Sequence, residues 1–218
     1  MTSGEETFTD EPAGPMAESV HRLDVAGPPL DSAAWVTALS LDDFIAQATV
    51  HQNLWQTTRR VAHIDDILIS SARALRGPLR ALVLLEDWCG DAIHTVPVVQ
   101  RLIEANSALV MRILRRDEQD ALMAAHLTGA ARAIPVVIVY DADGRERGWW
   151  GPRPSALQSW VQREGRAMET TERYRAIRTW YARDRGATTA AEVLALLQHA
   201  DRAHTDRTHV GRSEPRTR

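Results

Sequence analysis

Short apolar runs alternate with amphipathic stretches through the middle of the chain. The run Ala81–Leu85 (ALVLL) is typical of a buried strand, and residues 89–106 carry their apolar side chains on one helical stripe. Ala108–Leu114 (ALVMRIL) predicts a second strand, after which Asp117 can cap a helix that reaches Leu127. This half of the pattern therefore predicts a strand, a helix, a strand and a crossing helix.

The next segment predicts a hairpin followed by a helix. Pro135–Tyr140 (PVVIVY) is rich in β-branched residues and indicates a strand. The Asp141–Gly144 sequence (DADG) favours a tight turn, and Arg145–Trp150 then returns as the partner strand. Pro154 suits the first turn of a helix that runs to about residue 164.

This order of elements predicts an α/β fold. A right-handed strand-helix-strand unit makes the first two strands parallel, and the Asp-Gly turn makes the last two antiparallel. The expected result is a mixed four-stranded sheet with helices on both faces. Four further helices are expected outside this core, at 31–47, 65–75, 172–183 and 189–204.

The terminal segments differ in composition from the rest. Residues 1–31 are acidic and rich in Gly, Pro, Ser and Thr, so we expect a disordered N-terminal tail. Residues 32–204 are expected to form one domain, with terminal helical additions around a core at about 78–165. Residues 205–218 are expected to be a second disordered tail.

Composition excludes several classes of function. Among 218 residues, 44% are hydrophobic, but no apolar run approaches the roughly 20 residues that cross a bilayer, and the acidic N-terminus lacks the apolar stretch of a secretory signal. The net charge of −3 and a weakly basic tail do not indicate nucleic-acid binding. The eight histidines form no ligand-spaced cluster and no Gly-rich phosphate loop is present, so neither a metal nor a cofactor is expected. The single cysteine favours a reducing cytosol.

The sequence Asp87–Gly90 (DWCG) stands at the first strand-to-helix junction. Through this motif and the order of its elements, the chain resembles the thioredoxin superfamily. Trp88 matches the tryptophan before the thioredoxin cysteine, and Pro97 lies eight residues after Cys89, as the helix proline does in that family. Pro135 lies 46 residues after Cys89, where thioredoxins have a cis-proline. The resemblance therefore implies a cis peptide bond at Ile134-Pro135, whereas base rates alone favour a trans proline at the start of an edge strand.

Shorter motifs narrow the resemblance, which covers about residues 55–200. The runs WCGDA, RRDE, IPVV and GPRP are similar to a bacterial thioredoxin-like group that has Trp-Cys-Gly-Asp-Ala in place of Trp-Cys-Gly-Pro-Cys. Ala92 takes the place of the second cysteine, and Val83 takes the place of a buried acid that assists proton transfer in thioredoxins. A cycle of attack and internal resolution is therefore not open to this chain. A mixed disulfide on Cys89 would need an outside thiol, either a low-molecular-weight thiol or another protein, to resolve it.

Cys89 is the candidate catalytic residue. A position at the start of a helix predicts a lowered thiol pKa, although Asp91 works in the opposite direction. Trp88, Gly90 and Asp91 are expected to shape the site, and Ile134 and Pro135 to form a groove for an extended substrate. Cys89 can also be read as a small, partly buried side chain without chemistry.

Two other groups have open roles at this stage. Arg153 either prepares a helix start or holds a carboxylate of a small thiol or peptide. His94 either donates to the Cys89 thiolate or is an exposed helix residue.

Two functions follow from these residues. The first is a monothiol protein that exchanges disulfides through Cys89. The second is a redox-inactive module that uses the same groove to bind an extended peptide or a partner protein. The sequence indicates no oligomeric state.

Overall fold

The computed structural model describes residues 22–23 and 27–210. A five-stranded sheet forms its centre, in the order β1-β5-β4-β2-β3. The strands are β1 (Arg22–Leu23), β2 (Leu79–Leu85), β3 (Leu109–Arg115), β4 (Val136–Tyr140) and β5 (Glu146–Trp150). Strand β2 pairs parallel with β3 and antiparallel with β4, and β4 pairs antiparallel with β5. The expected mixed four-stranded sheet is confirmed, and the two-residue β1 adds to its edge beside β5.

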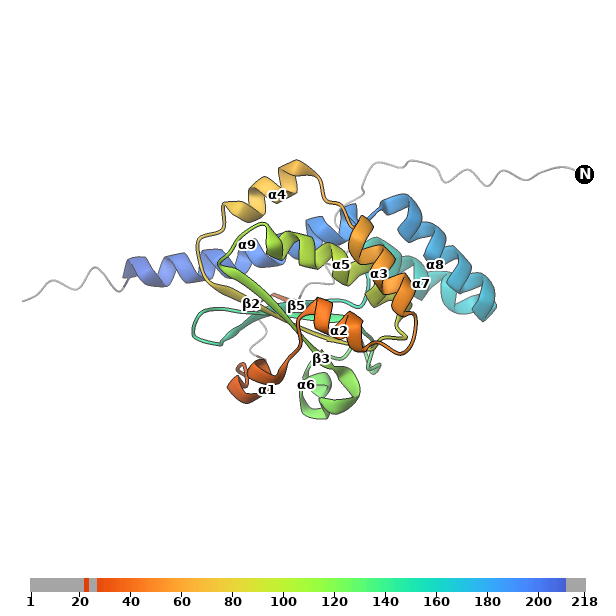
Figure 1. Ribbon diagram of the computed structural model, residues 1–218, viewed down its shortest axis with the longest axis horizontal. Coiled ribbons are helices and arrows are strands. Elements are labelled where there is room, and N and C mark those ends of the chain that lie inside the picture. The colour runs from red at the N-terminus through yellow and green to blue at the C-terminus, as the bar shows by residue number, and fades with distance from the viewer. Residues whose placement is uncertain (1–21, 24–26, 211–218) are drawn as a thin grey trace, which may run out of the picture.

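Helices cover both faces of the sheet. In Figure 1, α5 and α9 lie against one face, and α1 and α6 lie on the other side. Because both faces are covered, the central strands are buried on both sides, which explains their continuous apolar runs. The helices are α1 (Ser32–Thr37), α2 (Leu41–Gln47), α3 (Gln52–Val61), α4 (Asp66–Arg73), α5 (Gly90–Glu104), α6 (Asp120–Ala125), α7 (Ser155–Arg163), α8 (Thr170–Asp184) and α9 (Ala187–Val210), with 3₁₀ turns η1 (Arg116–Glu118) and η2 (Gly165–Ala167).

The two tails differ from the expectation of disorder where the structure describes them. Within residues 1–31, Arg22 and Leu23 pair with Trp149 and Gly148 of β5. At the other end, α9 continues to Val210 instead of stopping at residue 204. The rest of the predicted tails, residues 1–21, 24–26 and 211–218, lies outside the described residues.

The single helix expected over residues 31–47 is wrong, because the chain breaks it into α1 and α2. Leu39 leaves the helical conformation and forms an antiparallel bridge with Ile113 of the edge strand β3, through two backbone hydrogen bonds of 2.9 and 2.8 Å. Ser40 then caps α2 by accepting from the backbone N–H of Asp43. A long-range contact with the sheet therefore overrides the local helical pattern.

The crossing segment after β3 is also more irregular than expected. Asp117 does not cap a helix, because it lies inside the 3₁₀ turn η1. The α-helix that follows, α6, is only six residues long. The backbone N–H of Asp117 donates instead to Glu86 at the end of β2, at 3.0 Å, so this turn is tied to the loop that leads to Cys89.

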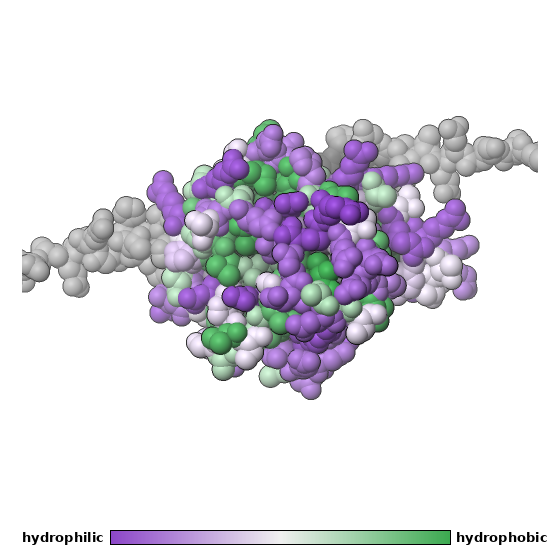
Figure 2. Space-filling model, viewed as in Figure 1, coloured by the Kyte–Doolittle hydropathy of each residue, from purple (hydrophilic) through white to green (hydrophobic). Residues whose placement is uncertain are grey.

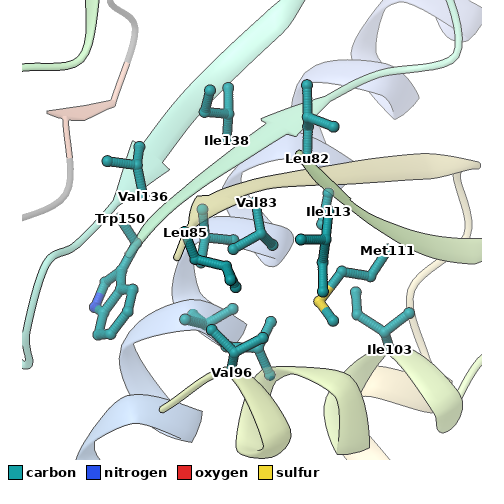
Figure 3. Close-up of a cluster of buried hydrophobic side chains, with 14 of the residues drawn as sticks. Leu82, Val83, Leu85, Val96, Ile103, Met111, Ile113, Val136, Ile138 and Trp150 are labelled. Carbon is teal, nitrogen blue, oxygen red and sulfur yellow. The ribbon is translucent and has the colours of Figure 1, made fainter. Parts of the chain in front are cut away.

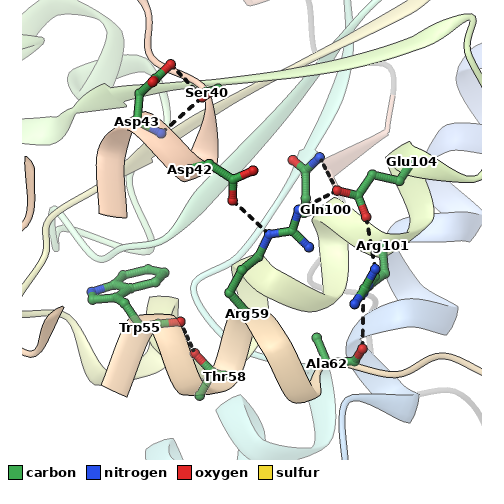
Figure 4. A network of polar contacts seen from close by, with 10 residues as sticks. All are labelled: Ser40, Asp42, Asp43, Trp55, Thr58, Arg59, Ala62, Gln100, Arg101 and Glu104. Carbon is green, nitrogen blue, oxygen red and sulfur yellow. Dashed lines mark hydrogen bonds and ion pairs between the residues drawn. The ribbon is translucent and has the colours of Figure 1, made fainter. Parts of the chain in front are cut away.

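Helix α3 has no counterpart among the expected elements. Its Arg59 side chain pairs with Asp42 of α2 at 3.1 Å and with Glu104 of α5 at 2.5 Å. Figure 4 shows this network, in which Arg101 of α5 also reaches the carbonyl of Ala62 just after α3. These contacts hold α3 against the helix that begins at Cys89.

The main core lies between the sheet and the pair α5 and α9. In Figure 3, Val83 of β2 and Ile113 of β3 point toward Val96 of α5, while Leu82 points to the other side. Helix α9 adds its own buried set to this core, namely Ala190, Val193, Leu194, Leu196, Leu197 and Ala200. The C-terminal helix is therefore part of the main core.

The surface gives no sign of a membrane span. None of the helices in the described part of the chain is long and apolar enough to cross a bilayer. Figure 2 shows hydrophilic side chains over most of one face, with smaller hydrophobic groups between them.

Candidate functional site

Cys89 lies where the chain passes from the sheet into helix α5. Its backbone is extended, and its carbonyl accepts the N–H of Ile93, so Cys89 is the N-cap of the helix. The side chain points inward and is only 6% exposed. The thiol donates a hydrogen bond to the carbonyl oxygen of Ile134, with an Sγ to O distance of 3.4 Å. The expected position at a helix start is therefore observed, and the thiol is buried there.

The Ile134-Pro135 peptide bond is cis, as the resemblance implied. It lies just before β4, and the contact with Ile134 places it directly against the thiol of Cys89. The structure thus brings the cysteine and the predicted groove together. The Ile134 carbonyl, however, already accepts the thiol, so a substrate that pairs with this carbonyl must displace the thiol from it.

Trp88 and Gly90 form the outer rim beside Cys89. The indole of Trp88 is 47% exposed, and the guanidinium of Arg116 lies 5.0 Å from the ring centroid. Gly90, the first residue of α5, is exposed and has open space around its α-carbon. Both positions are therefore accessible from solvent beside the buried thiol.

Asp91 is turned inward and does not belong to this rim. Its carboxylate is buried, pairs with the Nη2 of Arg153 at 2.6 Å and accepts the hydroxyl of Tyr181 at 2.9 Å. Arg153 lies just before α7, and its Nη1 also donates to Gln158 at 3.1 Å. Asp91 is therefore oriented toward the interior of the site, where Arg153 and Tyr181 hold it.

The expectation of a lowered thiol pKa is wrong. Burial and, after it, the nearby Asp91 carboxylate raise the pKa of Cys89 to about 11. The backbone N–H groups of Ala92 and Asp91 and the charge of Arg153 act in the opposite direction but do not offset these effects. At neutral pH the side chain is therefore almost entirely in the thiol form.

Tyr181 of α8 is a site residue that the sequence analysis missed. Its ring stacks on His94 of α5, with the centroids 4.9 Å apart. Burial, followed by the nearby Asp91, raises the pKa of Tyr181, and burial lowers the pKa of His94. His94 is thus used in packing, and no local sequence signal connects Tyr181, 90 residues away, to Asp91.

The remaining positions of the thioredoxin pattern are apolar. Ala92 and Val83 occupy the positions of the second cysteine and the buried acid of thioredoxins, and both are completely buried in the main core. Within residues 22–23 and 27–210, no group of three or more His, Cys, Asp or Glu side chains could hold a metal. Two surface hollows, one along α4 and one between α5 and β3, lie away from Cys89.

The loop before Cys89 is fixed by buried groups. The Asp87 carboxylate accepts the backbone N–H groups of Thr49 and Val50, at 2.8 and 3.1 Å. The indole N–H of Trp55 on α3 donates to the Asp87 carbonyl at 2.9 Å. The N-terminal helices α2 and α3 therefore determine where Trp88 and Cys89 lie.

Comparison with known proteins agrees with this geometry. The family described as Thioredoxin matches residues 38–172, which is more than half of the chain. No curated protein sequence matches this chain.

Two solved structures share the fold. One is a Pseudomonas aeruginosa protein of unknown function, PA1234, with 19% identity, a TM-score of 0.63, and coverage of 78% of this chain and 99% of that chain. The other is an HIV epitope-scaffold with 16% identity, a TM-score of 0.61, and coverage of 77% of this chain and 96% of that chain. At these identities the similarity concerns the fold alone.

Proposed function

Because the chain belongs to the thioredoxin family, we propose that it is a monothiol protein that exchanges disulfides through Cys89. The observation that carries this proposal is the contact between Cys89 and Ile134, which places the thiol against the residue before a cis-proline. Trp88 and Gly90 are exposed beside this contact, where an approaching chain can meet them. A low-molecular-weight disulfide or a protein disulfide is the proposed substrate class.

The exchange takes place in two steps. The Cys89 thiolate attacks one sulfur of a disulfide, forms a mixed disulfide and releases the other sulfur as a thiolate, which then takes up a proton. An external thiol, ionised in turn, attacks the substrate-derived sulfur, which restores the Cys89 thiol and leaves a new disulfide. Ala92 cannot perform this second step, so the reductant must come from outside the chain.

The second candidate is a redox-inactive binding module. It is favoured by the raised pKa of Cys89 and by the apolar residues at positions 83 and 92. In this case the groove at Ile134 and Pro135 would bind an extended segment of a partner, and Cys89 would only fill space. The two candidates differ in whether a disulfide forms on Cys89 in the folded protein.

The reaction of the folded protein with a small aromatic disulfide, followed by intact mass, separates the two functions. We expect one adduct per chain and a rate that rises about tenfold per pH unit between pH 7 and 10, because the thiolate fraction rises in this way below a pKa of about 11. The Cys89→Ser variant is the control and should form no adduct. A folded protein that forms no adduct at pH 10, while the same protein in denaturant reacts fully, would establish the binding module instead.

A further inference from the structure

A cluster of buried polar side chains adjoins the Cys89 thiol. Its members come from three separate elements: Asp91 from the first turn of α5, Arg153 from the loop after β5, and Tyr181 from α8. Asp91 is the shared partner, since one carboxylate oxygen accepts the Tyr181 hydroxyl and the other pairs with Arg153.

The cluster surrounds the thiol with charges of both signs. Asp91 disfavours the thiolate, and Arg153 favours it. Tyr181 is also close enough to interact with the Cys89 thiol. His94 stacks on the Tyr181 ring, and Arg178 of α8 is a further positive charge near His94. The two acids before Cys89 are engaged elsewhere, since Glu86 accepts from residue 117 and Asp87 from residues 49 and 50.

Both partners of Asp91 are held firmly. Tyr181 belongs to a small second core with Leu157 and Ile177, which anchors α8 against α7. Arg153 is fixed by Gln158, and its Nε is buried without a hydrogen-bond partner among the described residues. One donor of this guanidinium is therefore not used by the protein interior.

We infer that Arg153 and Tyr181 are positioning residues that hold the Asp91 carboxylate beside Cys89, and that the balance between Asp91 and Arg153 sets the pH at which the thiol reacts. This inference rests on the proposed exchange through Cys89. Thioredoxins have an acid where this chain has Val83, whereas here the buried acid near the thiol is on the helix, at position 91. A charged side chain close to a buried ionisable group shifts the pKa of that group by about 1–3 pH units, and the sign of the charge sets the direction.

The arrangement also affects how long an adduct lasts. When an external thiol resolves the mixed disulfide, Cys89 must leave as a thiolate, and a thiol with a high pKa is a slow leaving group. Each of the two charges, on Asp91 and on Arg153, therefore changes the rates of formation and of resolution of the mixed disulfide in the same direction. With Asp91 in place, Cys89 forms its adduct slowly and also releases it slowly.

The single cysteine makes a direct test possible. A protein labelled with ¹³C at cysteine Cβ gives one resonance, whose pH titration reports the ionisation of Cys89 without any disulfide partner. We expect Asp91→Asn to move the midpoint down by at least about one pH unit, because the Arg153 charge is then unopposed. We expect Arg153→Gln to move it up and to slow alkylation at pH 9 by about tenfold.

Further variants separate positioning from a structural role. Arg153→Lys keeps the positive charge and should keep most of the wild-type alkylation rate. Tyr181→Phe, the mildest change, removes one hydrogen bond that holds Asp91 beside Cys89 and should speed alkylation slightly. Asp143→Asn, in the turn at the far end of β4, is the matched control and should change nothing. The inference is overturned if folded Asp91→Asn and Arg153→Gln proteins titrate like the wild type or shift in the same direction. If one of these two proteins fails to fold, an unchanged titration of the other charge variant together with an unchanged alkylation profile of Tyr181→Phe overturns it as well. Because the titration needs no disulfide, its result is independent of whether exchange occurs.

Discussion

Replacement of Gly151 by alanine is expected to lower the free energy of unfolding by about 3 kcal/mol or more. Gly151 has a φ of +136°, which L side chains rarely adopt. A Cβ built at this position would overlap the carbonyl oxygen of Pro135 and lie 3.1 Å from its carbonyl carbon and 3.3 Å from the α-carbon of Val136. These atoms are backbone and cannot rotate away, so the end of β5 and the start of β4 would have to separate.

Denaturant unfolding of the variant and the wild type measures this effect. Gly90→Ala is the matched control, since it makes the same chemical change in the same region but meets no atom within 4 Å. Its stability should stay within about 1 kcal/mol of the wild type. If both alanine variants unfold at the same denaturant concentration, the close approach of Gly151 to Pro135 is not a constraint on this fold.

Replacement of Trp55 by alanine is the second prediction with a large effect. Trp55 is completely buried, packs edge-to-face on Phe44 at 5.5 Å, and donates to the carbonyl of Asp87 at 2.9 Å. Removal of the ring leaves a cavity and an unpaired carbonyl, which together should cost about 3–5 kcal/mol of unfolding free energy. Because Asp87 lies two residues before Cys89, the alkylation rate of the thiol should also rise as the loop loosens.

Two further substitutions calibrate the Trp55 result. Trp55→Phe keeps most of the buried volume but loses the N–H donor, so its loss should be clearly smaller, about 1–2 kcal/mol. Leu54→Ala, on the exposed side of the same helix, should stay within about 0.5 kcal/mol of the wild type. Equal losses for Trp55→Ala and Leu54→Ala, measured by thermal or chemical unfolding, would contradict the anchoring role of Trp55.

The sheet was predictable because its signals are local. The apolar runs of β2 and β4 are buried on both faces, so their composition alone identifies them, and the edge strand β3 has an apolar run of similar length that is partly exposed on one face. The turn at Asp141–Gly144 was equally clear, since Gly144 has the positive φ of 76° that a tight turn requires. The helix break at Leu39 was not predictable, because the cause is a pairing with Ile113, 74 residues further along the chain.

The candidate site was predictable in its placement but not in its electrostatics. The resemblance to thioredoxins implied that Cys89 and Pro135 lie close together, and in the structure the thiol contacts Ile134, the residue before this proline. The pKa of Cys89, however, depends on how deeply the thiol is buried and on Arg153, which lies 64 residues away in the sequence. A helix-terminus argument includes neither effect, and it therefore predicted the wrong direction.

Helix α9 has a consequence for the order in which the molecule is completed during synthesis. Its residues Val193, Leu196 and Leu197 cover strands that precede them in the chain, and α9 also packs along α5. A nascent chain that has emerged only as far as α8 therefore lacks the cover of β5 and the support of the helix that starts at Cys89.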